Sequence, residues 1–112
     1  MKLPGGAQAV VDLAKLRDYC LSASHARGRH KARVFASVLG LISSDAESLR
    51  GELLRAAQEG DATAGDTDEF GARYTVDFEL VRVNRRAVVR SAWIVLQGET
   101  VPRLTSCYVL LD

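Results

Sequence analysis

The sequence is poor in the residues that build metal centres and disulfide frameworks. It contains two cysteines and two histidines in 112 residues, and no CxxC or Cys/His spacing suggests zinc. Cys20 and Cys107 stand in unrelated sequence contexts, which is typical of buried free thiols in a cytosolic protein. A disulfide therefore has no positive support, and we expect neither a metal nor a cofactor.

Several motifs of enzymes and of membrane proteins are also missing. There is no Walker-type GxxxxGK[ST], no GxGxxG, no HExxH and no GxSxG, so these nucleotide-binding and hydrolase classes have no support. The uninterrupted apolar runs are too short to span a bilayer, and residues 1–6 lack the apolar region of a signal peptide. We therefore expect a cytoplasmic protein with no membrane partner.

The net charge is only +1, but the charges are segregated along the chain. Residues 1–40 carry seven Lys and Arg against two acids, residues 41–71 carry two against eight, and residues 72–112 carry six against four. A neutral total can hide a basic face that binds a polyanion. Equally, the acidic middle segment can neutralise that face from within.

The apolar periodicity predicts an α+β fold in a single domain, residues 1–112. Helical spacing of apolar residues indicates helices over 13–21, 30–39 and about 46–58, with Asp12 as an N-cap and Ser44-x-x-Glu47 as a capping box. From Phe70 the period changes to two and predicts an antiparallel meander of three to four strands. The expected organisation is a helical part over 12–58, an acidic loop over 59–69 and a β-meander over 70–112. Val10 and Val11 are the candidates for a fourth strand.

A basic stretch around the second helix is the first candidate site. Both histidines and four cations lie within residues 25–33. Arg and Lys supply charge and donors to a phosphate, and His can move a proton near neutral pH. The plainer interpretation is a solvated helix start whose charges only keep the protein soluble.

A second candidate comes from the predicted sheet. Arg90 stands in the middle of an apolar strand, which is costly unless its guanidinium is paired or faces water or a ligand. Residues of like phase on neighbouring strands are adjacent, so Arg90, Arg103 and Thr105 could converge. The alternative is a cross-strand ion pair of Arg90 with Asp77 or Glu79.

Together these residues suit metal-free cleavage of RNA. The predicted catalytic residues are His30, Lys31, Arg90 and Thr105, and the predicted phosphate-binding residues are Arg29, Arg33 and Arg103, with no metal ligand. In such a reaction a base removes the proton of the ribose 2′-hydroxyl, cations stabilise the charge on the phosphate, and an acid protonates the leaving oxygen. The same inventory also describes a simple anion-binding patch.

Short segments spread over nearly the whole chain resemble a small uncharacterised bacterial domain family, found alone and at the C-terminus of larger toxin-like proteins. The segments are Asp18-Tyr19-Cys20-Leu21, residues 25–35, Leu39-Gly40, Gly71-Ala72-Arg73-Tyr74, Ser91-Ala92-Trp93-Ile94 and residues 102–108. The order of helices and sheet is similar to the toxin group of barnase, EndoU, colicin and RelE nucleases. That likeness implies site roles for His30, Lys31, Arg90, Arg103 and Thr105, although the chain has few histidines and no obvious acid/base pair.

Two functions follow as hypotheses. The first is a small ribonuclease toxin of a bacterial toxin–antitoxin pair, with RNA as substrate and a cognate antitoxin or immunity-type protein masking its basic face. The second is a non-enzymatic binding module such as an antitoxin, an immunity protein or a phage accessory domain, with residues 41–71 as an acidic contact face. Apolar residues on both faces of the later strands leave one layer uncovered, and a homodimer through the sheet would supply it.

Overall fold

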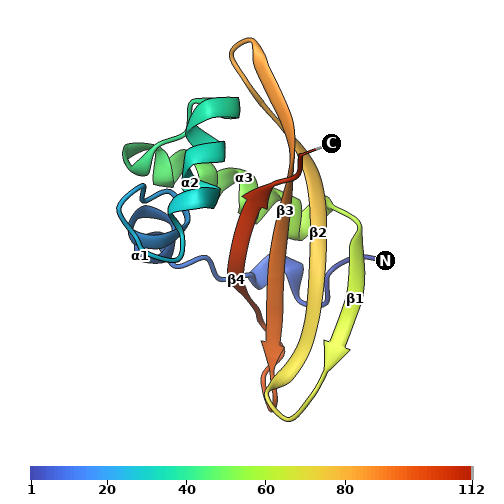
Figure 1. Ribbon diagram of the computed structural model, residues 1–112. Helices are drawn as coiled ribbons and strands as arrows, with labels where there is room; N and C mark the ends of the chain where they lie inside the picture. Colours follow the sequence, from blue (N-terminus) through green and yellow to red (C-terminus); the bar gives the residue numbers. More distant parts are fainter. Residues whose placement is uncertain (112) are drawn as a thin grey trace.

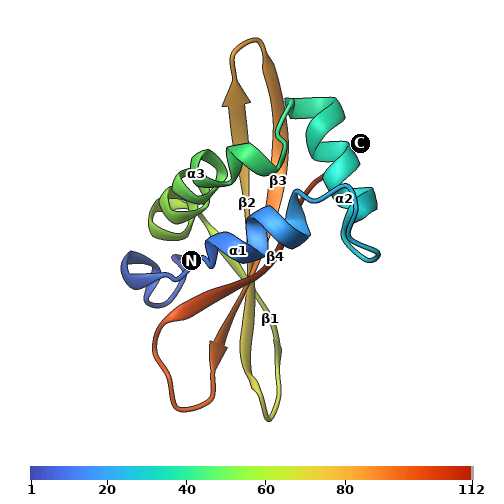
Figure 2. The ribbon, with the colours of Figure 1, turned by 90° about the vertical axis from the view of Figure 1, so that its left-hand side faces the viewer.

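Residues 1–111, which the computed structural model describes, form a helical N-terminal half followed by a four-stranded antiparallel sheet (Figure 1). The elements are α1 (Leu13–Lys15), α2 (Arg29–Val34), α3 (Ala46–Glu59), β1 (Ala62–Thr67), β2 (Gly71–Arg82), β3 (Arg85–Leu96) and β4 (Pro102–Val109). The strands lie in the order β1-β2-β3-β4. In Figure 1, α3 lies behind the sheet, and α1 and α2 stand along the edge formed by β4; Figure 2, turned by 90°, shows α3 to one side of the strands. The predicted α+β fold is confirmed.

The first and second helices follow the prediction to within one residue. Each begins as an α-helix and continues as a π-helical segment, Leu16–Cys20 after α1 and Phe35–Leu39 after α2. Asp12 caps the first helix as expected, because its Oδ1 accepts the Ala14 N–H at 2.9 Å. Gly40 follows the second with a φ of 68°, the left-handed conformation that glycine adopts without strain.

The predicted capping box at Ser44 and Glu47 is wrong, and a carboxylate cap made by Asp45 alone lies two residues earlier. A 3-10 turn, Ser43–Asp45, precedes α3. The Asp45 Oδ2 accepts the N–H of Ile42 at 2.9 Å, and the Asp45 N–H donates to the Ile42 carbonyl at 2.8 Å. Because the turn begins at Ser43, the N–H that needs a partner is that of Ile42. Asp45, and not Glu47, is three positions after it.

Part of the expected acidic loop over 59–69 is the edge strand β1. Its Cα partners in β2 include Val76 for Ala62 and Tyr74 for Ala64, and the register then shifts before Thr67. Every β1 residue after Ala62 is exposed, so the strand has no apolar alternation that the sequence could reveal. Val10, the other candidate strand, forms only an isolated parallel bridge with Arg103.

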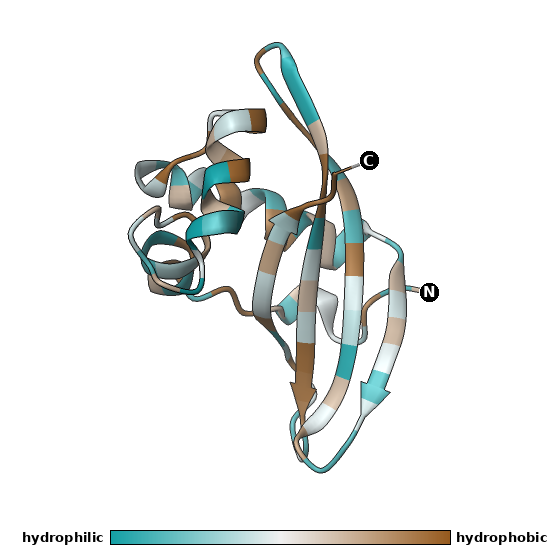
Figure 3. Ribbon diagram, viewed as in Figure 1, coloured by the Kyte–Doolittle hydropathy of each residue, from teal (hydrophilic) through white to brown (hydrophobic). Residues whose placement is uncertain are grey.

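The two faces of the sheet differ. Val76, Val89, Trp93 and Cys107 point to the helices and are buried in one core with Phe35 and Leu53. Figure 3 shows polar and apolar bands alternating along β2, as the period of two predicts. The opposite face carries Asp77, Arg90, Ile94 and Tyr108. Asp77, Arg90 and Tyr108 are paired across β2, β3 and β4, and Ile94 lies on the same side of β3 as Arg90. We call this second surface the open face.

A buried hydrogen-bond chain crosses the core side of the sheet. The Trp93 indole N–H donates to the Ser91 Oγ at 2.8 Å, and the Ser91 hydroxyl donates to the Val76 carbonyl at 2.8 Å. Ser91 is fully buried, and both of its polar roles are satisfied.

None of the helices in the described part of the chain has the length and apolar character needed to cross a bilayer.

Candidate functional site

A row of polar side chains crosses the open face. Asp77 of β2 pairs with Arg90 of β3, and Arg90 pairs with Tyr108 of β4. The Arg90 Nε and Nη2 donate to the two carboxylate oxygens of Asp77, each at 2.8 Å. Both side chains are 38% exposed, so the pair is accessible to a ligand. The cross-strand ion pair that the sequence left open as an alternative for Arg90 is therefore formed with Asp77.

This pairing sets the electrostatics of the row. The hydrogen bonds from Arg90 hold the pKa of the Asp77 carboxyl below its usual range. Asp77 first, and the Tyr108 hydroxyl second, raise the pKa of the Arg90 guanidinium above its already high ordinary value. Asp77 is therefore a fixed carboxylate at neutral pH rather than a proton carrier, and it holds Arg90 in a defined orientation.

Lys31 joins the row from the other half of the molecule. The α2 helix packs on β4, and the Lys31 Nζ lies 4.7 Å from the centroid of the Tyr108 ring, within the range of a cation–π contact. Lys31 and Arg90 are thus both neighbours of one aromatic residue. We call Lys31, Asp77, Arg90 and Tyr108 the Tyr108 cluster.

The Tyr108 cluster is suited to binding an anion. A guanidinium has five N–H donors, and Asp77 accepts only two of those of Arg90. The remaining donors, the Lys31 ammonium and the Tyr108 hydroxyl can all be offered to a phosphate. Arg presents a planar fork and Lys a point charge, which together fit a phosphodiester whose charge increases during reaction.

The histidine predicted as the acid/base stands outside this cluster. His30 is exposed on α2, and no hydrogen bond or ion pair of its side chain is found within residues 1–111. Consecutive helical residues point about 100° apart, so His30 and Lys31 project in different directions. Arg29 and Arg33 are exposed on the same helix, but each is two residues from Lys31 and so projects about 200° round the helix from it, away from the cluster.

Arg103 and Thr105 do not meet Arg90 as expected. The Arg103 Nε donates to Glu99 Oε1 at 3.1 Å, and its Cα partner in β3 is Ile94, roughly 13 Å along the strand from Arg90. Thr105 lies where the register of β3 and β4 shifts, and its hydroxyl donates to the Ala92 carbonyl at 3.1 Å. The irregularity separates Thr105 from the row that contains Tyr108.

Thr105 instead borders a pocket beside the β4 edge, which we call the basic pocket. Its lining includes Lys15, His25 and Arg27, with Asp18 as an acidic member. The His25 Nδ1 accepts the backbone N–H groups of Arg27 and Gly28, each at 3.1 Å. These two donors place the proton of the neutral ring on Nε2. The Nε2–H of His25 is thereby a hydrogen-bond donor of the pocket, together with the side chains of Lys15 and Arg27.

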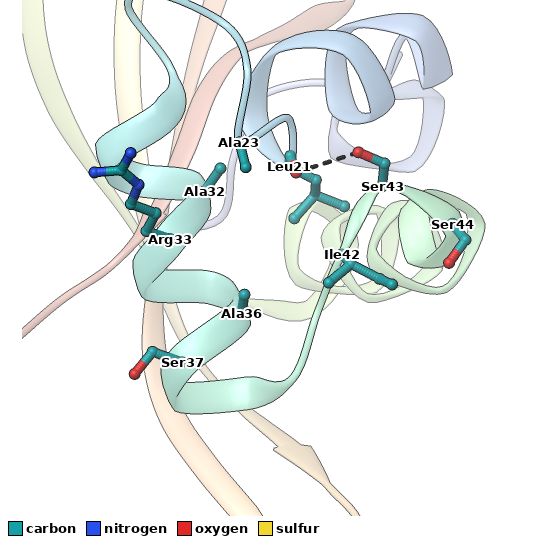
Figure 4. Close-up of a pocket in the computed structure, with 9 residues that line it drawn as sticks. All are labelled: Leu21, Ala23, Ala32, Arg33, Ala36, Ser37, Ile42, Ser43 and Ser44. Carbon is teal, nitrogen blue, oxygen red and sulfur yellow. Dashed lines mark hydrogen bonds between the residues drawn. The ribbon is translucent and has the colours of Figure 1, made fainter.

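A second hollow lies between α2 and the turn before α3 (Figure 4). Its lining consists of small and apolar side chains with Arg33 at one side, and the Ser43 hydroxyl donates to the Leu21 carbonyl at 3.2 Å. It holds no group that could transfer a proton near neutral pH.

Over the part of the chain that the structure describes, no three His, Cys, Asp or Glu side chains are grouped to hold a metal ion.

A family model described as a domain of unknown function (DUF6883) matches residues 2–111. The chain belongs to this family. The prediction of an uncharacterised domain family is thereby confirmed for nearly the whole sequence.

The fold of this DUF6883 domain is also found in a solved structure. That structure is described as a contact-dependent growth inhibition toxin–immunity protein complex from Klebsiella pneumoniae 342. The match has a TM-score of 0.69 and 14% sequence identity, and covers 91% of this chain and 100% of the other. At this identity the likeness shows the fold alone. A search of curated proteins gave no match.

Sequence reasoning on this DUF6883 domain found the cations of the Tyr108 cluster but missed Tyr108. Lys31 was visible as part of the basic stretch and Arg90 as a charge inside an apolar strand. Tyr108 had no comparable signal, because its position between them depends on the strand register and on how α2 packs on β4. The basic pocket was likewise hidden, since Lys15 and Thr105 come from distant parts of the chain.

Proposed function

We propose that the chain is the toxin-type member of a toxin–immunity pair and that it cleaves RNA in the cytoplasm without a metal ion. The observation that carries this proposal is the placement of Lys31 and Arg90 around Tyr108 on the open face. The Klebsiella complex supports the assignment to a toxin system, because a chain of that assembly has the same fold.

The proposal assigns roles to the Tyr108 cluster and to the residues predicted around it. Arg90, oriented by Asp77, and Lys31 contact the scissile phosphate and stabilise the charge that grows on it when the 2′-hydroxyl attacks. The Tyr108 hydroxyl donates to a phosphate oxygen. His30, exposed beside Lys31, serves as the acid/base after its side chain turns toward the bound RNA. Arg29, Arg33 and Arg103 contact the neighbouring backbone phosphates, and Thr105 orients the chain at the β4 edge.

The proposed partner is an immunity-type protein that covers the open face. Its contact surface would offer carboxylates to Lys31 and Arg90, so that binding excludes RNA by charge as well as by shape. A second copy of the chain is the other occupant to consider for this face. It would have to bring together two surfaces that both carry the Asp77–Arg90 pair, which is unfavourable unless the pairs interlock.

The test is cleavage of total RNA by the purified chain in the presence of EDTA. We expect cleavage by the native protein and a loss of at least about 100-fold in Lys31→Met and Arg90→Met, the size typical of one lost transition-state contact. Arg86→Met is the matched control, since Arg86 lies on the same face and pairs with Glu79 at 3.7 Å, away from the cluster. Equal loss in all three variants, or no cleavage by a folded native protein, contradicts the proposal.

His30→Ala and Tyr108→Phe then separate the roles within the site. His30→Ala should abolish cleavage but leave binding of a short RNA unchanged, because it removes a proton carrier. Tyr108→Phe keeps the ring beneath Lys31 and removes only the hydroxyl, so a smaller loss of rate is expected. If His30→Ala cleaves like the native protein, the acid/base role belongs to another residue.

A non-enzymatic binding module is the second candidate, and the acidic end of β1 favours it. Asp66 and Glu69 are exposed there, and no ion pair involves them within residues 1–111. The test is co-purification with the product of the adjacent gene. Loss of that complex in Asp66→Lys, together with a native protein that is folded but inactive on RNA, would support this second function.

A further inference from the structure

The basic pocket beside β4 is a second place where cations converge, and the proposed cleavage uses only Thr105 of its lining. Its volume is about 750 Å³, within the range of small-molecule sites. Lys15 reaches it from α1, His25 and Arg27 from the loop before α2, and Thr105 from β4. These segments are distant in the sequence, so the packing of the helical half along β4 builds the pocket.

His25 is held in a fixed orientation at the pocket. Its Nδ1 accepts the backbone N–H groups of Arg27 and Gly28, each at 3.1 Å, and its ring meets that of Tyr19 edge-on, with the centroids 4.7 Å apart. A side chain at Gly28 would collide with the Tyr19 carbonyl, so the turn lies directly against the first helix. Because the turn occupies Nδ1, the Nε2–H on the other side of the ring is the group left to donate to a ligand.

The two cations of the pocket keep most of their donors available. The Lys15 Nζ donates to the Thr105 carbonyl at 3.3 Å, which positions the ammonium and leaves two of its three N–H groups. Arg27 is exposed, and no ion pair or hydrogen bond of its guanidinium is found within residues 1–111. Asp18, the acidic member of the lining, forms its ion pair with Arg17 at 3.2 Å and not with either cation of the pocket.

We propose that the basic pocket binds the terminal phosphate of a nucleotide, as a phosphate monoester on a free nucleotide or at an RNA end. A phosphate monoester offers three acceptor oxygens and close to two negative charges at neutral pH. The pocket offers three donor groups, of which the Lys15 ammonium and the Arg27 guanidinium are cations. A phosphodiester within an RNA strand carries only one charge and would leave one cation unmatched. The proposal stands whether or not the chain cleaves RNA.

The rest of the lining is suited to the sugar and base of a nucleotide. The Thr105 hydroxyl donates to the Ala92 carbonyl at 3.1 Å, so its oxygen is left to accept a hydrogen bond, as from a ribose hydroxyl. Tyr19 is half-buried in the lining, and its ring offers a surface on which a base can pack. The phosphate of a modified peptide needs neither group, which favours a nucleotide as the ligand.

The test compares two short 2′-O-methyl RNAs that differ only in a 5′-phosphate or a 5′-hydroxyl end, with binding to the full chain measured by fluorescence anisotropy. The 2′-O-methyl groups prevent attack by the 2′-hydroxyl, so the result does not depend on catalysis. We expect the phosphorylated RNA to bind at least about tenfold more tightly, as charge-assisted hydrogen bonds to a dianion require. Displacement by adenosine 5′-monophosphate would extend the site to free nucleotides, and its absence would restrict the site to RNA ends.

Variants locate the phosphate in the pocket. Lys15→Met and Arg27→Met should each remove most of the preference for the phosphorylated end, whereas Asp18→Asn should keep or increase it, because an acid leaves the lining. Arg55→Met, on the exposed side of α3, is the charge-matched control and should retain the preference. Lys31→Met should also retain it, although that change removes a cation of the Tyr108 cluster.

These measurements separate this site from the proposed function. A native chain that prefers the phosphorylated end but cleaves no RNA would refute the cleavage and keep the pocket. Equal affinity for the two RNA ends, a preference that survives in Arg27→Met, or equally tight binding of a phosphoserine peptide would overturn the proposal. Arg27 has an exposed side chain, so Arg27→Met decides the matter even if Lys15→Met fails to fold.

Discussion

Val83 is a residue whose backbone conformation conflicts with its side chain. It lies in the two-residue turn between β2 and β3 with a φ of 54°, where a β-branched side chain is strained. The side chain is 96% exposed, so no packing opposes a change. We expect Val83→Gly to raise the free energy of unfolding by about 1 kcal/mol, measured by urea denaturation.

The neighbouring turn residue supplies the control for this prediction. Asn84 is not among the non-glycine residues with a positive φ, so Asn84→Gly relieves no strain and only adds freedom to the unfolded chain. It should leave stability unchanged or lower it slightly. A gain in Asn84→Gly equal to that in Val83→Gly would mean that turn flexibility, and not the strain at Val83, limits stability.

The Asp77–Arg90 pair should make a pH-dependent contribution to stability. Arg90 holds the pKa of Asp77 below its usual range, so the contribution is present above about pH 4 and is lost as pH falls through the lower, folded-state pKa. Since both side chains are 38% exposed, Asp77→Asn should cost no more than about 1 kcal/mol at pH 7.

Urea denaturation from pH 7 down to pH 2 measures that contribution. The curves of the native protein and Asp77→Asn should differ at neutral pH and converge in acid. In an Arg90→Met background, Asp77→Asn should have a smaller effect. A difference that persists unchanged at pH 2 would show that Asp77 acts through its shape and not through its charge.

At the scale of elements, the start of α3 depends on one carboxylate. Asp45 accepts the Ile42 N–H at 2.9 Å and receives Arg82 from the β2–β3 hairpin at 3.3 Å. Asp45→Ala should therefore lower the free energy of unfolding by about 1 kcal/mol, the usual cost of a lost helix cap. Ser44→Ala is the matched control and should be nearly neutral, because the box predicted at Ser44 is not formed. Thermal unfolding of the two variants compares them directly, and equal losses would refute the role of Asp45.

The elements that the sequence predicted well are those rich in apolar residues. In the helices and β2 these residues recur with a period that matches the core, and in β3 and β4 they occupy both faces. The β1 segment carries only small and polar residues, and pairing with β2 makes it a strand. The Asp45 cap was missed for a related reason, since a 3-10 turn shifted the helix start by less than one turn.

At the scale of the whole molecule, the site depends on contacts between the two halves of the chain. Lys31 and Arg90 stood out as charges in unusual places, and their types were enough to suggest phosphate chemistry. Their common neighbour Tyr108 comes into place through the packing of the helices along β4. Such long-range placement is not encoded in any local spacing, so a pattern analysis cannot find it.

The same packing predicts how the molecule unfolds. Leu16, Phe35 and Leu53 from the helices share one core with Val76 and Trp93 from the sheet, so neither half can bury its apolar face alone. We propose that residues 1–112 form one domain with a single unfolding transition. Trp93 is the one tryptophan of the sequence and is 1% exposed between the layers, so its fluorescence reports their contact.

Urea curves from Trp93 fluorescence and from far-UV circular dichroism should therefore have the same midpoint and slope. The Val83→Gly variant should shift both curves together, although its change lies at the hairpin tip and touches neither the helices nor Trp93. If fluorescence changes while helical dichroism persists, the helical half folds independently of the sheet. The Tyr108 cluster would then lie at a junction between two units, and its geometry would depend on their association rather than on a single core.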